Sequence, residues 1–177
     1  MKRSIISVLV GVLAFVSLSS AGEYRGQQNR EIKSLSEKDV EAIRSGKGWG
    51  LAKAAELNGY PGPRHVLDLA EQLELSESQF AAMTALFNQM QADAIAAGKR
   101  YLAAEKALEL AFRDKYVTDE GLNKLVKEAG LARADMRYVH LRIHLSSVDL
   151  LSEQQIQKYS HLRGYAQGGH SHQHHDH

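Results

Sequence analysis

The amino-acid sequence predicts an all-α protein built around a long antiparallel helical hairpin, with shorter helices packed against it. Its only two prolines, Pro61 and Pro63, stand in one short stretch, as is typical of an all-α chain. Two long segments, residues 76–116 and 119–150, repeat apolar side chains at alternating steps of three and four, the pattern of a helix that packs against another helix. The loop between them is short, so the two helices should fold back on each other.

The first 21 residues have the pattern of an export signal. Lys2 and Arg3 form a positive start, residues 5–16 form an apolar run, and Ser19 to Ala21 supply the small residues of a cleavage site. The apolar run is short for a membrane span of about 20 residues, so a cleaved leader is preferred to an N-terminal anchor. The chain has no cysteine, which excludes a lipid-anchored lipoprotein, disulfides and a thiolate metal site. We therefore expect the mature protein in a bacterial periplasm.

The mature chain has the size of one domain. Without Lys2 and Arg3, 20 basic side chains stand against 21 acidic ones, a formal charge of −1, so no nucleic-acid partner is expected. Residues 22–35 are polar and without period, which predicts a flexible N-terminus. Residues 36–165 should form the helical domain, and residues 166–177, rich in glycine and histidine, a disordered tail.

Short helices are predicted before the hairpin. Ser36 begins a capping signal for a helix that runs to Arg44 and is interrupted by the glycines of residues 45–48. A second short helix is expected over residues 51–57. Pro63 is well placed as the first residue of a third helix, which should continue to Leu73.

The first long helix opens at Ser76. Its hydroxyl should cap an orphan backbone amide while the Gln79 side chain reaches back, which makes a capping box. The following segment of about 40 residues would form a helix about 60 Å long. It has no proline and one glycine, Gly98, which destabilises the helix by about 1 kcal/mol relative to alanine and is a candidate site for a bend. The predicted apolar seam of this helix is Phe80, Met83, Phe87, Met90, Ala94, Ala97, Tyr101, Ala104, Leu108 and Ala111.

The second long helix opens at Thr118, with acidic residues in its first turn. The capping signal then returns 76 residues after the first, with Ser152 and Gln155, and opens a last helix that stops near Gly164. We interpret both boxes as structural caps. Because two helices cannot bury both sides of their seam, we expect a homodimer or a higher assembly. The seam of the second helix is Leu122, Leu125, Ala129, Ala132, Met136, Val139, Ile143 and Leu150.

Two L-[ST]-x-x-Q elements that open helices and flank a long hairpin behind an export signal resemble the Spy/CpxP family. The similar stretches are residues 59–67, the two Ser-x-x-Gln boxes and residues 159–165, which together bracket residues 57–165. The family includes periplasmic chaperones, envelope-stress regulators and zinc-responsive or heavy-metal-sensing relatives. The resemblance implies an all-α curved hairpin, often paired as a dimer, without enzymatic activity.

His140 and His144 stand one turn apart on the same face of a predicted helix, with Met136 one turn before them. Neutral imidazoles bind zinc, copper and nickel, and a thioether adds a soft ligand for copper. The motif is not that of a zinc protease, which needs glutamate where Leu141 stands. His65 or a second protomer would supply a third ligand. The alternative is that both histidines border the core and hydrogen-bond to a neighbouring helix or to water.

The C-terminal tail carries five histidines in its last eight residues, and such a segment binds transition metals with little selectivity. It is interpreted either as a flexible metal scavenger or as a tail without a selected role. These histidines are His170, His172, His174, His175 and His177.

A holdase needs an apolar surface that stays in contact with water, together with charges that attract its clients. Four apolar side chains of the hairpin lie off the seam: Phe112, Tyr116, Tyr138 and Leu141. The cations expected near them are Lys99, Arg100, Lys106, Arg113, Lys115, Arg133, Arg137 and Arg142. The alternative is that these charges form only the solvated side of the hairpin.

Two functions remain. The first is a periplasmic, ATP-independent chaperone or envelope-stress protein of Spy/CpxP type, which binds unfolded or misfolded proteins. The second is a sensor or buffer of zinc, copper or nickel that signals to a membrane partner. Neither requires a cofactor beyond such a metal. No phosphate-binding loop, nucleophile elbow or paired carboxylates stand out, so no enzyme is expected.

Overall fold

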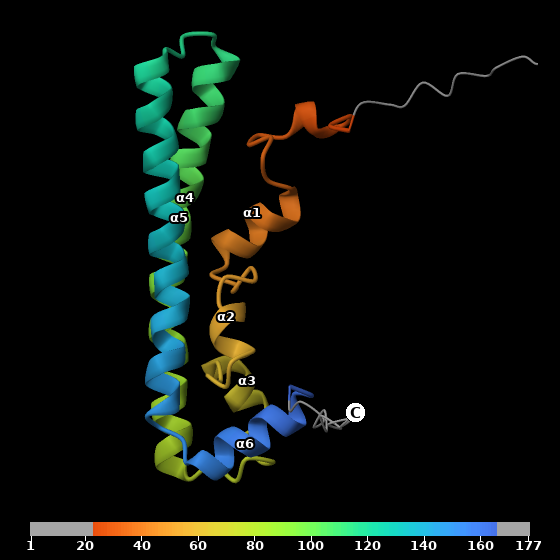
Figure 1. Cartoon of the computed structure of the whole chain (residues 1–177), viewed down its shortest axis with the longest axis vertical. Coiled ribbons are helices and arrows are strands. Elements are labelled where there is room, and N and C mark those ends of the chain that lie inside the picture. The colour runs from red at the N-terminus through yellow and green to blue at the C-terminus, as the bar shows by residue number, and fades with distance from the viewer. Residues whose placement is uncertain (1–22, 166–177) are drawn as a thin grey trace, which may run out of the picture.

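The computed structural model describes residues 23–165, in which all regular elements are helices (Figure 1). The predicted leader and the histidine-rich tail lie outside this range. The all-α fold with a long helical hairpin is confirmed. In chain order the elements are the 3-10 helix η1 (Gln27–Asn29) and the α-helices α1 (Glu37–Arg44), α2 (Lys53–Glu56), α3 (Pro63–Asp68), α4 (Glu77–Arg113), α5 (Asp119–Val148) and α6 (Glu153–Leu162).

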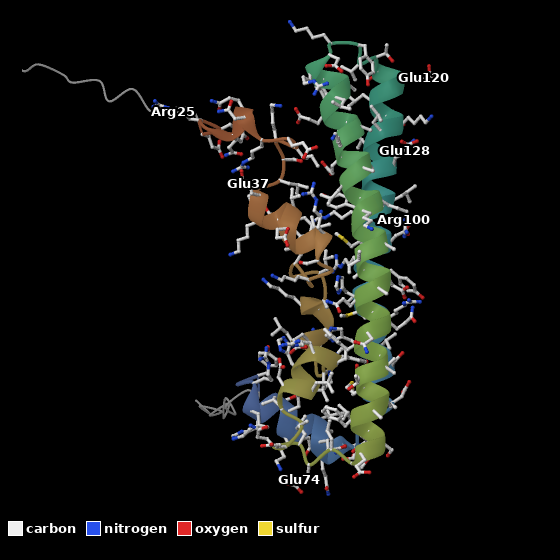
Figure 2. The ribbon with its side chains drawn as sticks, turned by 180° about the vertical axis from the view of Figure 1, so that it is seen from behind. Arg25, Glu37, Glu74, Arg100, Glu120 and Glu128 are labelled. Atoms are coloured by element: carbon white, nitrogen blue, oxygen red, sulfur yellow. The ribbon has the colours of Figure 1, made fainter. Side chains whose placement is uncertain are left out.

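Helices α4 and α5 pack along each other and form the hairpin. Most of the predicted α4 seam is buried, including Met83, Met90 and Tyr101. Phe80 is an exception, with 48% of its surface exposed, because Gln79 takes the position that faces α6. Segments 23–73 and α6 lie along one side of the hairpin, and both views show the opposite side uncovered (Figures 1 and 2).

The two capping boxes form as predicted and are also joined to each other. The Ser76 hydroxyl accepts from the Gln79 N–H, and the Ser152 hydroxyl accepts from the Gln155 N–H, each at 3.2 Å. The Gln79 side-chain amide donates to the Gln155 oxygen at 2.9 Å, and the Gln155 amide donates to the Gln79 oxygen at 3.1 Å. This reciprocal pair fixes α6 across the base of the hairpin, where Lys158 also forms an ion pair with Glu74 at 2.7 Å (Figure 2).

The N-terminal segment differs from the sequence prediction of a flexible stretch over residues 22–35. Ile32 and Leu35 are each 5% exposed and belong to the core. Lys33 forms an ion pair with Glu109 of α4, and Lys106 of α4 forms one with Glu31. The two apolar side chains, three residues apart, are enough to attach this segment to the hairpin, although two residues do not form a periodic pattern in the sequence.

The glycines explain how α1 and the following turn reach α4. A Cβ on Gly98 would lie 2.7 Å from the Ile43 carbonyl oxygen, and a Cβ on Gly46 would lie 3.0 Å from the Gln91 carbonyl oxygen. Gly46 also has a φ of 68°, which favours glycine. The glycine that was predicted to permit a bend is therefore buried under the end of α1, where it allows close packing.

Two apolar clusters stabilise the fold. The upper cluster, in the orientation of Figure 1, joins the N-terminal segment, α1 and the middle of the hairpin around Ile43, Tyr101 and Met136. The lower cluster joins α3, α6 and the base of the hairpin around Val66 and Tyr159. No helix within residues 23–165 has the length and apolar character that a membrane span needs.

Candidate functional site

A cavity of about 590 Å³ lies between the two apolar clusters. The glycine-rich turn of residues 45–50, helix α2 and the start of α3 form one wall. The hairpin forms the other wall through Phe87, Met90 and Gln91 of α4 and through His140 and His144 of α5. Both predicted imidazole ligands therefore line a real space in the protein.

His140 and His144 are 3% and 7% exposed. Burial is the main cause that lowers the pKa of His140, and neighbouring His144 lowers it further. His140 is therefore neutral at pH 7, with a lone pair on one ring nitrogen. The two rings come from successive turns of α5 and reach the cavity side by side.

One hydrogen bond fixes the orientation and the tautomer of His144. Its Nδ1 lies 2.7 Å from the backbone carbonyl oxygen of Tyr60, which accepts only, so Nδ1 carries the proton. In the neutral ring the lone pair is then on Nε2. Gly62 lies against this edge of the ring: a Cβ there would be 3.1 Å from Nε2 and 2.8 Å from Cε1. Since Gly62 has an ordinary extended backbone (φ −84°), the imidazole is the reason for the missing side chain.

Glu56 of α2 is a partly buried carboxylate, with 12% of its side chain exposed, that joins four parts of the chain. Its Oε1 accepts from the Tyr159 hydroxyl of α6 and lies 3.6 Å from the Arg163 guanidinium. Its Oε2 accepts from the Gly62 N–H at 3.1 Å and lies 3.8 Å from His144 Nδ1. Burial and this carboxylate raise the pKa of the Tyr159 phenol, which stays protonated as the donor.

The predicted ligands do not all meet. Met136 is 2% exposed and packs in the upper cluster, so it does not line the cavity, and Met90 of α4 does. His65 lines the cavity with a side chain that is 42% exposed and with Nδ1 3.8 Å from Asp68. Within residues 23–165 no three histidine, aspartate or glutamate side chains are grouped as metal ligands. The five tail histidines lie outside the described residues.

A second candidate surface is the outer face of α5. Leu131, Tyr138 and Leu145 follow one another at intervals of seven residues and are 67%, 65% and 58% exposed. Intervals of seven return to the same side of a helix, and this side is opposite to the buried one that carries Met136 and Ile143. Helix α5 therefore exposes a row of three large apolar side chains opposite its buried face.

The apolar side chains proposed for client binding are only partly confirmed as a surface. Phe112 and Tyr116, at the tip of the hairpin, are 54% and 62% exposed, whereas Leu141 is half-buried. Four of the eight predicted cations have partners inside the chain: Lys106 with Glu31, Arg113 with Asp114, Arg142 with Asp93, and Arg133 over the ring of Trp49. The exposed others are Lys99, Arg100, Lys115 and Arg137.

Sequence reasoning missed Glu56, Gly62 and Met90. In the sequence Glu56 looks like any other charged residue on a helix surface. Gly62 was assigned to the turn between the two prolines, and Met90 was assigned to the apolar seam that packs against the second long helix. The row of Leu131 and Leu145 could have been found, because each lies seven residues from Tyr138.

Comparison of the chain with protein-family models, curated proteins and solved structures finds no match.

Proposed function

We propose that the protein is an exported, periplasmic, ATP-independent chaperone of Spy/CpxP type that holds unfolded polypeptide segments on the outer face of α5. The observation that carries this proposal is the row of Leu131, Tyr138 and Leu145, which is exposed and opposite to the core. Export rests on the leader pattern of residues 1–21, and no enzymatic step is part of the proposal.

The row is flanked by apolar side chains along one edge and by charged Asp135 and Arg142, four residues after Leu131 and Tyr138, along the other. Exposed Ala134 and half-buried Leu141 and Val148 continue the same face at steps of three and four. Contiguous exposed apolar patches on soluble proteins mark interaction sites. In Figure 2, Glu120 and Glu128 lie on the side of the hairpin that faces away from α1–α3, and within residues 23–165 no element covers that side.

The shape of the face fits an extended segment. Leu131 and Leu145 are fourteen residues apart, which is about 21 Å along a helix at 1.5 Å per residue. An extended chain rises about 3.3 Å per residue, so about six client residues would lie along the row. Exposed Arg137 lies one turn before Leu141 and gives that edge of the face a positive charge that attracts acidic clients.

The experiment that tests the proposal is light scattering of reduced, aggregating α-lactalbumin with and without the metal-free protein. The variant replaces Leu131, Tyr138 and Leu145 by serine. The matched control replaces two exposed leucines and one exposed tyrosine elsewhere by serine, namely Leu57, Leu162 and Tyr24. The proposal expects the natural protein and the control to suppress aggregation and the α5 variant to lose most of the suppression.

Equal suppression by both variants would contradict the proposed surface, and no suppression by the natural protein would contradict the holdase function. A second copy of the chain is the competing occupant of the same face. The homodimer expected from the sequence stays a prediction, and sedimentation of the natural protein and of the α5 variant measures it directly.

A second candidate function is a sensor or buffer of zinc, copper or nickel that signals to a membrane partner. The observation that favours it is the cavity, because His140 and His144 reach it from one helix and His65 lines it from α3. Its test is metal binding by the folded domain. Failure of that test leaves the holdase proposal unaffected, since the α5 row and the cavity lie on different sides of the helix.

A further inference from the structure

We propose that the cavity binds one copper(I) ion through the imidazoles of His140 and His144 and the thioether of Met90. These three side chains come from the two helices of the hairpin and line the same cavity. The proposal deepens the second candidate function by naming its metal and its ligands, and it is independent of client binding on the outer face of α5.

His144 offers a single ligand atom. The Tyr60 carbonyl oxygen holds the proton on Nδ1, so Nε2 is the ring nitrogen left to bind a metal. Such a bond from the second ring nitrogen to a backbone carbonyl is the usual way in which a metal-binding histidine is oriented. Gly62 keeps the space beside Nε2 open, since a Cβ would stand 3.1 Å from this atom.

His140 offers the second ligand. It is 3% exposed, lines the cavity and has no hydrogen-bond partner in the part of the chain that the structure describes. Among residues 23–165 the fully buried side-chain nitrogens and oxygens without a partner belong to Arg142 and Arg163, so the ring nitrogens of His140 are not sealed in the core. Since His140 lines the cavity, a metal ion there can reach one of these nitrogens.

The third ligand, Met90, determines which metal the site prefers. Met90 is 8% exposed and brings a thioether, which binds copper(I) far better than zinc. The nearby carboxylate of Glu56 is not free, because its oxygens already accept from Tyr159 and from the Gly62 N–H. Imidazole nitrogens and a thioether sulfur bind a metal in their uncharged forms, and such a soft ligand set suits a monovalent soft ion.

The test uses the full chain with the five histidines of residues 170–177 replaced by asparagine, so that the tail does not compete. Copper(I) affinity is measured anaerobically against a chromophoric copper(I) chelator. We expect one ion per chain, bound more tightly than zinc, and a loss of more than about 100-fold in His140→Ala, His144→Ala and Met90→Leu, since losing a residue that only orients a ligand already costs about 10- to 100-fold.

Matched controls separate ligand loss from general damage. Met136→Leu changes a buried methionine that does not line the cavity, and His161→Ala changes an exposed histidine of α6, so both should keep the affinity of the parent. Gly62→Ala removes no ligand but crowds Nε2 of His144, and it should weaken binding by about 10- to 100-fold.

A measurement without ligand substitutions keeps the proposal testable if a variant unfolds. Silver(I), a redox-inert substitute for copper(I), is added to the same chain with its methionine methyl groups labelled with carbon-13. The Met90 signal should shift while those of Met83 and Met136 stay in place. Stronger binding of zinc than of copper(I), unchanged affinity in the ligand variants, or an unshifted Met90 methyl would each overturn the proposal.

Discussion

The same substitution, glycine to alanine, should have opposite effects at two positions of the hairpin. Gly98 in α4 and Gly130 in α5 are both interior helix positions. Alanine in a helix is favoured over glycine by about 1 kcal/mol. A Cβ at Gly130 would meet nothing within 4 Å, so Gly130→Ala should stabilise the protein by about that amount.

At Gly98 the added Cβ would stand 2.7 Å from the backbone oxygen of Ile43 and 2.8 Å from its Cγ2. The end of α1 would have to retreat until these contacts reach ordinary van der Waals distance, at 3.4 Å or more. Overpacking of this kind costs about 1 to 3 kcal/mol. Gly98→Ala should therefore be less stable than Gly130→Ala by about 1 to 3 kcal/mol, with a net stability at or below that of the natural protein.

The assay is urea denaturation followed by helical circular dichroism. Trp49 fluorescence reports separately on the α1 region, because its ring lies 6.0 Å from that of Tyr101 on α4. Detachment of α1 in Gly98→Ala would appear first in the tryptophan signal. If both variants are stabilised to within about 0.5 kcal/mol of each other, α1 does not pack on α4 as described.

The remaining predictions concern the base of the hairpin and the buried ionisable groups. In a double-mutant cycle of stability against urea, Gln79→Ala and Gln155→Ala should show a coupling energy of about 0.5 to 3 kcal/mol, because each side-chain amide donates to the other. Additive effects of the two substitutions would contradict this hydrogen-bonded pair. Glu56→Gln should cost about 1 to 3 kcal/mol in the same assay, because Tyr159 and its other donors lose a charged acceptor; a neutral effect would contradict it. Burial is the main cause that raises the pKa of Tyr101 to about 12, so the unfolded chain loses this proton first as the pH rises above 10. Stability should then fall between pH 10 and 12, and Tyr101→Phe should reduce that fall, whereas an unchanged slope would refute it.

The parts of the fold that depend on local signals could be predicted from the sequence. Ser76, Ser152 and Thr118 begin their helices because each hydroxyl caps an amide three residues on, a contact that requires only neighbouring residues. The apolar seam and the short loop similarly determine the hairpin. The helix that begins at Pro63 ends at Asp68 rather than continuing to Leu73, because the chain turns there to place Leu73 in the lower cluster.

The parts that depend on distant contacts could not be predicted. Nothing near Gln79 shows that its amide bonds Gln155, and nothing near Glu56 shows that Tyr159 reaches it across 103 positions of the chain. The two predicted imidazoles both line the cavity. The methionine that lines it is Met90 of α4 and not the expected Met136, because Met136 packs in the upper cluster while Met90 reaches the cavity from the opposite helix.

The most direct test of the central claim is photo-crosslinking from the outer face of α5. A photoreactive phenylalanine analogue replaces Tyr138 in one protein and exposed Leu57 in another, and each is irradiated with unfolded, reduced α-lactalbumin. If the α5 face holds unfolded segments, the protein labelled at position 138 gives an adduct with the client and the protein labelled at position 57 does not. An adduct only between two copies of the protein, or equal adducts from both positions, would contradict the proposed function.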